Sequence, residues 1–237
     1  MGGNKGRLCG IVKHDHNLIY SPGIAMYIPK YYSREDRTEL FEFMKNNNFG
    51  ILFSHTGDKP MASHLPFVIE EEAGDQGLVL GHVAKANLQW RYADGQQVMV
   101  VFHGPHTYIS PISPTSPTLY QEDNVVPTWN YVAVHATGIF KVFQDRSAME
   151  ENLSRLTDQH ESSQPKPWQM DYGTEYADQM IKRVVGFQIE IFDLKGKWKL
   201  NQNHSEVRRR RLSEGLKAQG DGVNLQVAQL IDEDMEG

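Results

Sequence analysis

The sequence has 237 residues, 39% of them hydrophobic, which is enough to bury one sizeable core. Its negative mean hydropathy excludes a protein made of membrane spans, and its formal net charge of -6 argues against long-range attraction to nucleic acid. The only cysteine, Cys9, excludes a disulfide within one chain and a cysteine-based zinc site. These features predict a soluble protein of the reducing cytoplasm.

The N-terminal part of the chain predicts an irregular extension followed by a helix. Residues 1 to 25 contain no apolar stretch long enough for a secretory signal, so we expect a disordered extension, with Met1 and Met26 both open as the native start. The helix is expected to begin after Ser33, whose hydroxyl can cap its first turn, and to bury Leu40 and Met44.

From there to about residue 143 the pattern is mostly that of strands. β-type segments alternate with turn-forming Gly-Asp and Asp-Gly pairs, which predicts an antiparallel meander. The clearest segment is the last, in which Val132 and Val134 point to one face and Tyr131 and His135 to the other. The expected strands are residues 50 to 57, 61 to 70, 77 to 82, 96 to 103 and 130 to 143.

The remaining elements are a loop, helices and one late strand. Five prolines predict a long loop over residues 104 to 128. Apolar residues at helical spacing predict one helix after residue 144 and a second that includes Val184 and Val185, and a strand is expected at residues 186 to 194. Residues 204 to 219 and 222 to 233 are expected to form two terminal helices.

The stretch "GHVAKANLQW", residues 81 to 90, predicts a strand that turns into a helix with a lysine in the bend. Free backbone N–H groups at a helix start, the Lys85 ammonium and a capping Asn87 would together attract a phosphate, with Arg91 as a second cation. The alternative is an ordinary corner between a strand and a helix.

Other side chains give weaker signals. The six histidines between residues 55 and 135 lack the spacing of metal ligands, so no metal site is expected. Trp129 and Asn130 either contact a flat heteroaromatic ring or close the end of a barrel. The arginines at 208 to 211 would point in four directions on a helix and therefore do not form a DNA-recognition stripe.

Six ordered motifs resemble the PaiB family of FMN-binding negative transcriptional regulators. They are "MYIPKYY", "MASHLPFV", "GHVAKANLQW", "VMVVFHGPHTYISP", "VPTWNYVAVHATG" and "GKWKLNQN". The resemblance implies a mainly β, α+β fold: an antiparallel split β-barrel of the FMN-binding type over residues 26 to 200, with helical insertions, followed by C-terminal helices over 201 to 237. It also implies FMN as cofactor, a homodimer with the flavin between subunits, and repression of protease and sporulation genes.

The resemblance also implies a set of cofactor contacts, with the phosphate at the corner around Lys85 and the flavin ring near Ser63. It implies no catalytic residue. The implied FMN-binding residues are Ser63, His64, Pro66, His82, Val83, Ala84, Lys85, Ala86, Asn87, Trp129, Asn130, Lys199 and Gln202. Two features depart from the family pattern: the loop at 110 to 120 is enlarged and lacks a tryptophan, and Asn201 replaces a serine.

The favoured function is a non-enzymatic regulator that acts without a conventional DNA-recognition helix, so contact with DNA, direct or indirect, stays open. An alternative is a flavin oxidoreductase that uses a nicotinamide nucleotide as electron donor. A third, less favoured hypothesis is a split barrel that binds or degrades haem, because the strand region is rich in histidine.

Overall fold

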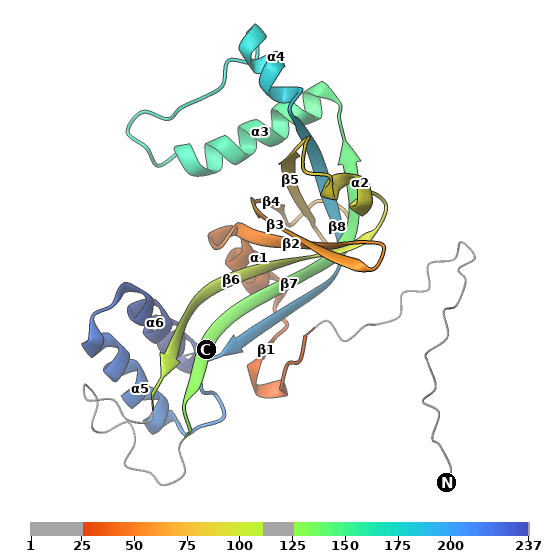
Figure 1. Cartoon of the computed structure of the whole chain (residues 1–237). Helices are drawn as coiled ribbons and strands as arrows, with labels where there is room; N and C mark the ends of the chain where they lie inside the picture. The colour runs from red at the N-terminus through yellow and green to blue at the C-terminus, as the bar shows by residue number, and fades with distance from the viewer. Residues whose placement is uncertain (1–25, 111–125, 237) are drawn as a thin grey trace, which may run out of the picture.

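The computed structural model describes residues 26–110 and 126–236, which form one curved antiparallel sheet with helices around it (Figure 1). The strands are β1 (Ser33–Arg34), β2 (Phe49–Thr56), β3 (Lys59–Pro66), β4 (Val68–Glu70), β5 (Leu78–Ala84), β6 (Gln97–Ile109), β7 (Thr128–Phe143) and β8 (Val184–Lys199). The helices are η1 (Lys30–Tyr32), α1 (Arg37–Asn46), α2 (Gln89–Ala93), α3 (Arg146–Glu161), α4 (Glu175–Ile181), α5 (Glu206–Gln219) and α6 (Gly222–Glu236).

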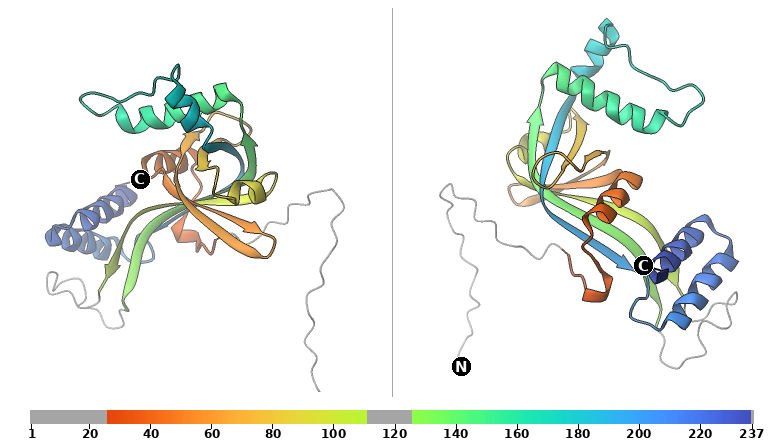
Figure 2. Two further views of the ribbon diagram at one scale, coloured as in Figure 1. Left: turned by 45° about the horizontal axis from the view of Figure 1, so that its top comes forward. Right: turned by 180° about the vertical axis from the view of Figure 1, so that it is seen from behind.

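The sheet has the strand order β3-β2-β6-β7-β8-β5-β4, and β1 pairs with β8 beside this path. Every strand pair within the described ranges is antiparallel. Figures 1 and 2 show β6, β7 and β8 extending well beyond the smaller strands, with α5 and α6 at one end and α3 and α4 at the other. The expected antiparallel, mainly β architecture is therefore confirmed.

The core lies inside the curl of the sheet, where aromatic rings pack on one another. Phe140 and Phe187 stack with their ring centroids 4.6 Å apart, and Phe67 meets Phe187 edge-on at 6.2 Å. All three are fully buried. On β7 Val132 and Val134 are fully buried, as the alternation of the sequence predicts, so burial of apolar area fixes which face of the strand turns inward.

The predicted start of the first helix is wrong. Ser33 belongs to β1, where it pairs with Lys197 of β8, so the chain is still extended at that residue. Asp36 caps α1 instead, because its carboxylate accepts a hydrogen bond of 2.9 Å from the backbone N–H of Glu39. The helix consequently begins three residues later, at Arg37.

The predicted loop begins too early, because β6 continues through Gly104 and Pro105 to Ile109. The register between β6 and β7 shifts between His103 and His106, and such a bulge accommodates a proline, which has no backbone N–H for the ladder. The predicted loop also ends too late by one residue, because Thr128 begins β7. Residues 111–125 of that loop and the predicted extension, residues 1–25, lie outside the described residues.

The last strand is longer than expected. Val184 and Val185, predicted to be helical, begin β8, in which Val185 pairs with Val83 and is buried. Their branched side chains fit the pleated core, and this tertiary contact outweighs the helical spacing of the sequence. The boundary expected near residue 200 between a barrel domain and the C-terminal helices stays a prediction.

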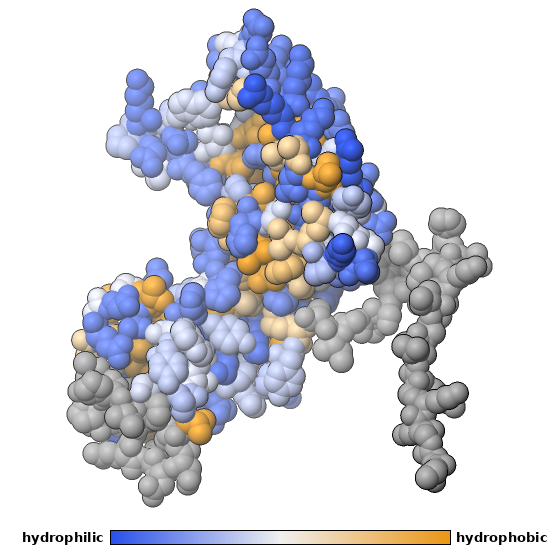
Figure 3. Space-filling view, in the orientation of Figure 1, coloured by the Kyte–Doolittle hydropathy of each residue, from blue (hydrophilic) through white to orange (hydrophobic). Residues whose placement is uncertain are grey.

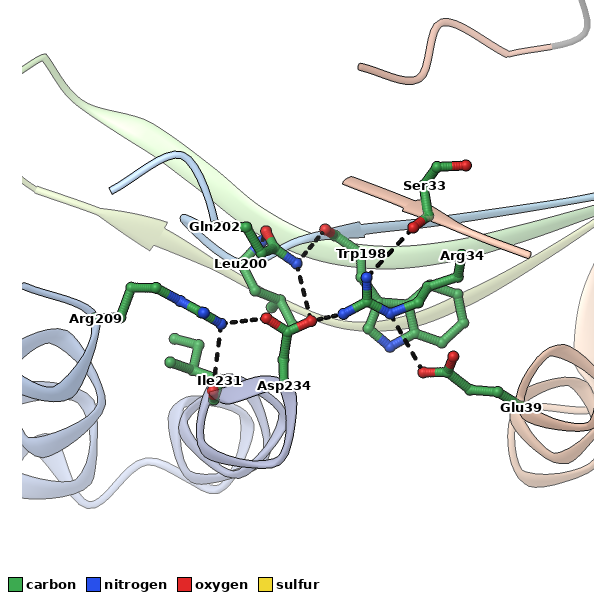
Figure 4. Close-up of polar contacts among 9 residues, drawn as sticks. All are labelled: Ser33, Arg34, Glu39, Trp198, Leu200, Gln202, Arg209, Ile231 and Asp234. Atoms are coloured by element: carbon green, nitrogen blue, oxygen red, sulfur yellow. Dashed lines mark hydrogen bonds and ion pairs between the residues drawn. The ribbon is translucent and has the colours of Figure 1, made fainter. Parts of the chain in front are cut away.

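Both terminal helices are confirmed, and α5 ends at Gln219, followed by the capping Gly220, whose positive φ of 69° suits a residue without a Cβ. Asp234 of α6 joins this helix pair to the sheet (Figure 4). Its carboxylate forms ion pairs with Arg34 of β1 and Arg209 of α5, and it accepts a longer contact of 3.4 Å from Gln202. Arg210, one residue on, points away and pairs with Glu206. The arginine run therefore points in different directions, as predicted.

Candidate functional site: the corner after β5 and the open sheet face

The corner between β5 and α2 is a tight turn whose backbone is largely satisfied by the protein. The N–H of Lys85 donates to Arg183 O at 2.7 Å, and the N–H of Asn87 donates to Ala84 O at 2.8 Å. The N–H of Gln89 donates to the side-chain Oδ1 of Asn87 at 3.1 Å. The prediction of several free N–H groups is thus wrong for these three residues. With five residues, α2 is also too short to supply a strong helix dipole.

The donors left at the corner nevertheless form a compatible set for a phosphate. The backbone N–H groups of Ala86 and Leu88 have no acceptor among residues 26–110 and 126–236, and neither does one N–H of the Asn87 amide. The exposed Lys85 ammonium has no acidic partner in the same ranges. A phosphate dianion needs such an ammonium with several N–H donors, so the chemistry of this corner fits the phosphate of FMN. Arg91 instead lies over the Trp90 ring, with its guanidinium carbon 5.0 Å from the ring centroid.

Side chains from β3, α2 and the turn itself meet behind this corner. The hydroxyl of Ser63 on β3 donates to Gln89 Oε1 at 2.5 Å and accepts from Asn87 Nδ2 at 2.9 Å. Two of the predicted residues, Ser63 and Asn87, are therefore in direct contact. Gln89, which is fully buried, was missed, because a glutamine in a short helix usually faces solvent and nothing local in the sequence marks it.

The other predicted residues of β3 and β5 have different environments. His64 and Ala84 are exposed, Pro66 is half-buried and Val83 lies in the core. His82 is partly buried; its Nδ1 atom has no hydrogen-bond partner within the described part of the chain, and burial lowers the pKa of its imidazole. Val83 is therefore closed to a ligand, whereas the other four keep at least part of their surface accessible.

Trp129 and Lys199 lie together at the far end of β7 and β8. Trp129 is 53% exposed, and the Lys199 ammonium donates to its carbonyl oxygen at 2.7 Å and to the Thr128 hydroxyl. Burial, followed by repulsion from Lys197, lowers the pKa of Lys199. Tyr108 stands beside Trp129 with a centroid distance of 5.7 Å, which makes this end of the sheet an exposed aromatic surface with a cation next to it.

Asn130 and Gln202 point away from that surface. Asn130 pairs across the ladder with Thr107, whose hydroxyl bonds to Asn224 of α6, so the fully buried Asn130 amide lies on the side of the sheet that α6 covers. Its nitrogen and oxygen have no partner among the described atoms. The amide of Gln202 bonds to Leu200 N and Trp198 O, each at 2.8 Å. Neither residue joins the corner or the exposed aromatic surface.

The corner and the aromatic surface lie at opposite ends of one strand. Ala84, just before the corner, pairs with Val184 at the start of β8, whereas Lys199 ends that strand. The 16 residues of β8 correspond to about 50 Å of extended chain at about 3.3 Å per residue. Figure 1 shows α2 at one end of these long strands, and the start of β7 and the arrowhead of β8 at the other. One FMN molecule cannot contact both groups within one subunit.

Comparison with known proteins identifies the family. Residues 26–193 match the family model described as "Putative FMN-binding domain". The chain belongs to this FMN-binding family. It is also 32% identical over 213 residues to the Bacillus subtilis protein named "Protease synthase and sporulation protein PAI 2", a match that covers 89% of this chain and 99% of that protein. The resemblance to PaiB is confirmed, and FMN is the cofactor of the family.

Solved structures support the fold. The flavocytochrome Anf3 from Azotobacter vinelandii superposes with a TM-score of 0.55 and 13% identity, covering 75% of each chain. The FAD and heme binding protein from Mycobacterium smegmatis gives 0.54 and 13%, covering 75% of this chain and 78% of that one. The expected split β-barrel of the FMN-binding family is therefore confirmed. Within residues 26–110 and 126–236, no helix has the length and apolar character to cross a membrane.

Proposed function

We propose that this protein is a PaiB-like, FMN-binding regulator of protease and sporulation genes, in which the FMN phosphate binds at the corner formed by Lys85, Ala86 and Asn87. The observation that carries the binding site is the exposed Lys85 ammonium, which has no acidic partner in the described part of the chain and stands beside unused N–H donors. The regulatory role rests on the family and on the name of the Bacillus subtilis relative.

We include a homodimer in this proposal, because the corner near the start of β8 and the aromatic surface near its end can meet one flavin only if two subunits supply them. The outer face of the sheet suits such contact. Three large side chains there are half or more exposed: Phe49, Tyr108 and Trp129, at 63%, 50% and 53%. Figure 3 shows apolar surface at the middle of the molecule, over the strands. A second copy would cover such a surface.

Regulation in this proposal does not use α5 to recognise DNA. Arg209 is buried on Asp234, and Arg210 is paired with Glu206, so the arginine run offers no continuous basic stripe. The regulator would therefore act through a flavin-dependent contact with another component. A cytoplasmic location belongs to the same proposal and rests on the single cysteine of the sequence.

A test of the phosphate site compares Lys85→Ala with Lys45→Ala, since Lys45 is a solvent-exposed lysine paired with Glu71 on another part of the surface. We expect Lys85→Ala to weaken FMN binding by about 1 to 3 kcal/mol, the usual cost of a lost charged hydrogen-bond partner. Lys45→Ala should leave it unchanged. Titration followed by quenching of flavin fluorescence measures both affinities.

Riboflavin, which lacks the phosphate, serves as the matched ligand and should bind wild type and Lys85→Ala equally well. If Lys85→Ala binds FMN as tightly as the wild type, the phosphate lies elsewhere. If the purified protein binds no FMN at all, the proposed cofactor is wrong. If the protein loaded with FMN sediments as a monomer, the proposed dimer is wrong.

A further inference from the structure

Gln89 is the centre of a buried hydrogen-bond network that joins α2 to β2 and β3. Its side chain is fully buried. The two N–H groups of its amide donate to Leu52 O at 3.2 Å and to Ser54 Oγ at 2.9 Å, and its Oε1 accepts from Ser63 Oγ at 2.5 Å. Both N–H groups of this amide and its oxygen thus have a partner, which fixes the orientation of the amide.

This fixed orientation determines the hydrogen bonds of Ser63. A serine hydroxyl has one proton, and here Gln89 Oε1 accepts it. Ser63 Oγ can therefore only accept from other groups, as it does from Asn87 Nδ2 at 2.9 Å. Ser63 consequently acts as an acceptor toward the corner.

The orientation of the Asn87 amide follows in turn. The backbone N–H of Gln89 must meet an acceptor, so Asn87 places Oδ1 there at 3.1 Å and Nδ2 toward Ser63. A flipped amide would bring two donors together at the Gln89 N–H. Gln89 therefore controls Asn87 twice, through its own backbone N–H and through Ser63. The second N–H of Asn87 Nδ2 stays unused by residues 26–110 and 126–236.

We infer that Gln89 is a positioning residue for FMN: it holds Ser63 and Asn87 so that the remaining N–H of Asn87 is available to a phosphate oxygen. This inference rests on the proposed phosphate site at Lys85. Gln89 itself does not touch the ligand. A purely structural role, in which the same network only ties α2 to the β2–β3 hairpin, predicts different results in the following tests.

The first test is Gln89→Met, which keeps a side chain of similar length but removes all three hydrogen bonds of the amide. FMN affinity should fall about tenfold, as expected when one charge-assisted hydrogen bond is lost, while riboflavin affinity should change less than about twofold. Gln96→Met is the control, because Gln96 is an exposed glutamine seven residues further on. Fluorescence titration with both ligands gives the ratio of affinities.

The second test asks whether Gln89 acts through Ser63. If it does, the double variant Gln89→Met with Ser63→Ala should bind FMN within about twofold of Gln89→Met alone, because both substitutions disrupt the same orientation of Asn87. Independent effects would instead multiply.

The third test uses Gln89→Glu, which also covers the case in which Gln89→Met fails to fold. A protonated carboxyl can still accept from Ser63 and donate its one proton to Leu52 O, while the Ser54 hydroxyl can turn to donate to it; the ionised form would instead place a carboxylate oxygen against the carbonyl of Leu52. Burial raises the pKa of a carboxyl group, so FMN affinity relative to wild type at the same pH should recover as the pH falls. Comparison with wild type cancels the titration of the FMN phosphate itself.

The outcomes separate this inference from the proposed function. Equal losses of FMN and riboflavin affinity in Gln89→Met, multiplying effects in the double variant, or a Gln89→Glu variant without pH-dependent recovery would each overturn the positioning role while Lys85→Ala still weakens FMN. If wild type binds no FMN, or Lys85→Ala has no effect, the proposed phosphate site fails and this inference fails with it.

Discussion

Asp234→Asn tests the ionic cluster that holds α6 against the sheet (Figure 4). The Asp234 side chain is 7% exposed, and its two oxygens face Arg34 and Arg209. Asparagine has the same shape but no charge. Its amide N–H groups would point at one of the two guanidinium groups, which also have only donors. The substitution therefore leaves Arg209 without its ion-pair partner and Arg34 with Glu39 alone.

The magnitude follows from how far each arginine can recover. Arg209, 11% exposed, has little access to water, whereas Arg34 is 23% exposed and keeps a contact of 3.5 Å with Glu39. Removing one partner of a buried ion pair costs about 3 to 5 kcal/mol, and the partial recovery of Arg34 places this case near 3 kcal/mol. Urea unfolding at pH 7 measures the loss, and hydrogen exchange over residues 222–236 should report faster opening of α6.

Asp232→Asn on the same helix is the matched control. Asp232 pairs with Lys217 at the surface, where the two side chains are 31% and 51% exposed, so its loss should cost at most about 1 kcal/mol. If the two variants are equally stable, the cluster around Asp234 does not hold α6 in place and the electrostatic argument is wrong.

Two further predictions concern the core and the pH dependence of stability. Phe187→Ala should lower the free energy of unfolding by about 3 to 5 kcal/mol, because a fully buried ring stacked on Phe140 leaves a cavity; a loss below about 1 kcal/mol in urea unfolding would contradict the packing. Burial lowers the pKa of His82 from its ordinary 6.5, so below about pH 6.5 the unfolded chain binds a proton that the folded chain does not, and stability falls as the pH drops. His82→Gln should flatten this part of a profile of unfolding free energy measured between pH 5 and 7.5. His55→Gln is the control at an exposed histidine and should keep the fall at low pH. Parallel profiles for wild type and both variants would refute the assignment of this pH dependence to His82.

Much of the sheet could be predicted, because alternation of apolar and polar residues is a local property. The inward face of β7, with Val132 and Val134, was correct for this reason. The starts of α1 and β8 were not, since they depend on long-range pairing: Ser33 with Lys197, and Val185 with Val83. No local pattern contains that information.

In the candidate site, too, local features could be predicted from the sequence and long-range contacts could not. The motif around Lys85 was visible as a strand followed by a bend and a helix, and Ser63 came from the family resemblance. The role of Gln89 could not be predicted, because its burial arises from contacts with Leu52 and Ser54, which are more than thirty positions away in the sequence. Asn201, noted only as a departure from the family, has a positive φ of 63°, a conformation that asparagine tolerates better than serine.

The length of β8 has a consequence for stoichiometry. If each flavin takes its phosphate contacts from the corner of one subunit and its ring contacts from Trp129, beside the end of β8, in the other, then a mixed dimer of Lys85→Ala and Trp129→Ala subunits contains one intact site and one with both defects. When the two impaired variants are unfolded and refolded together, half the sites of every mixed dimer should therefore bind FMN tightly again. Sites formed within single subunits would not recover in this way.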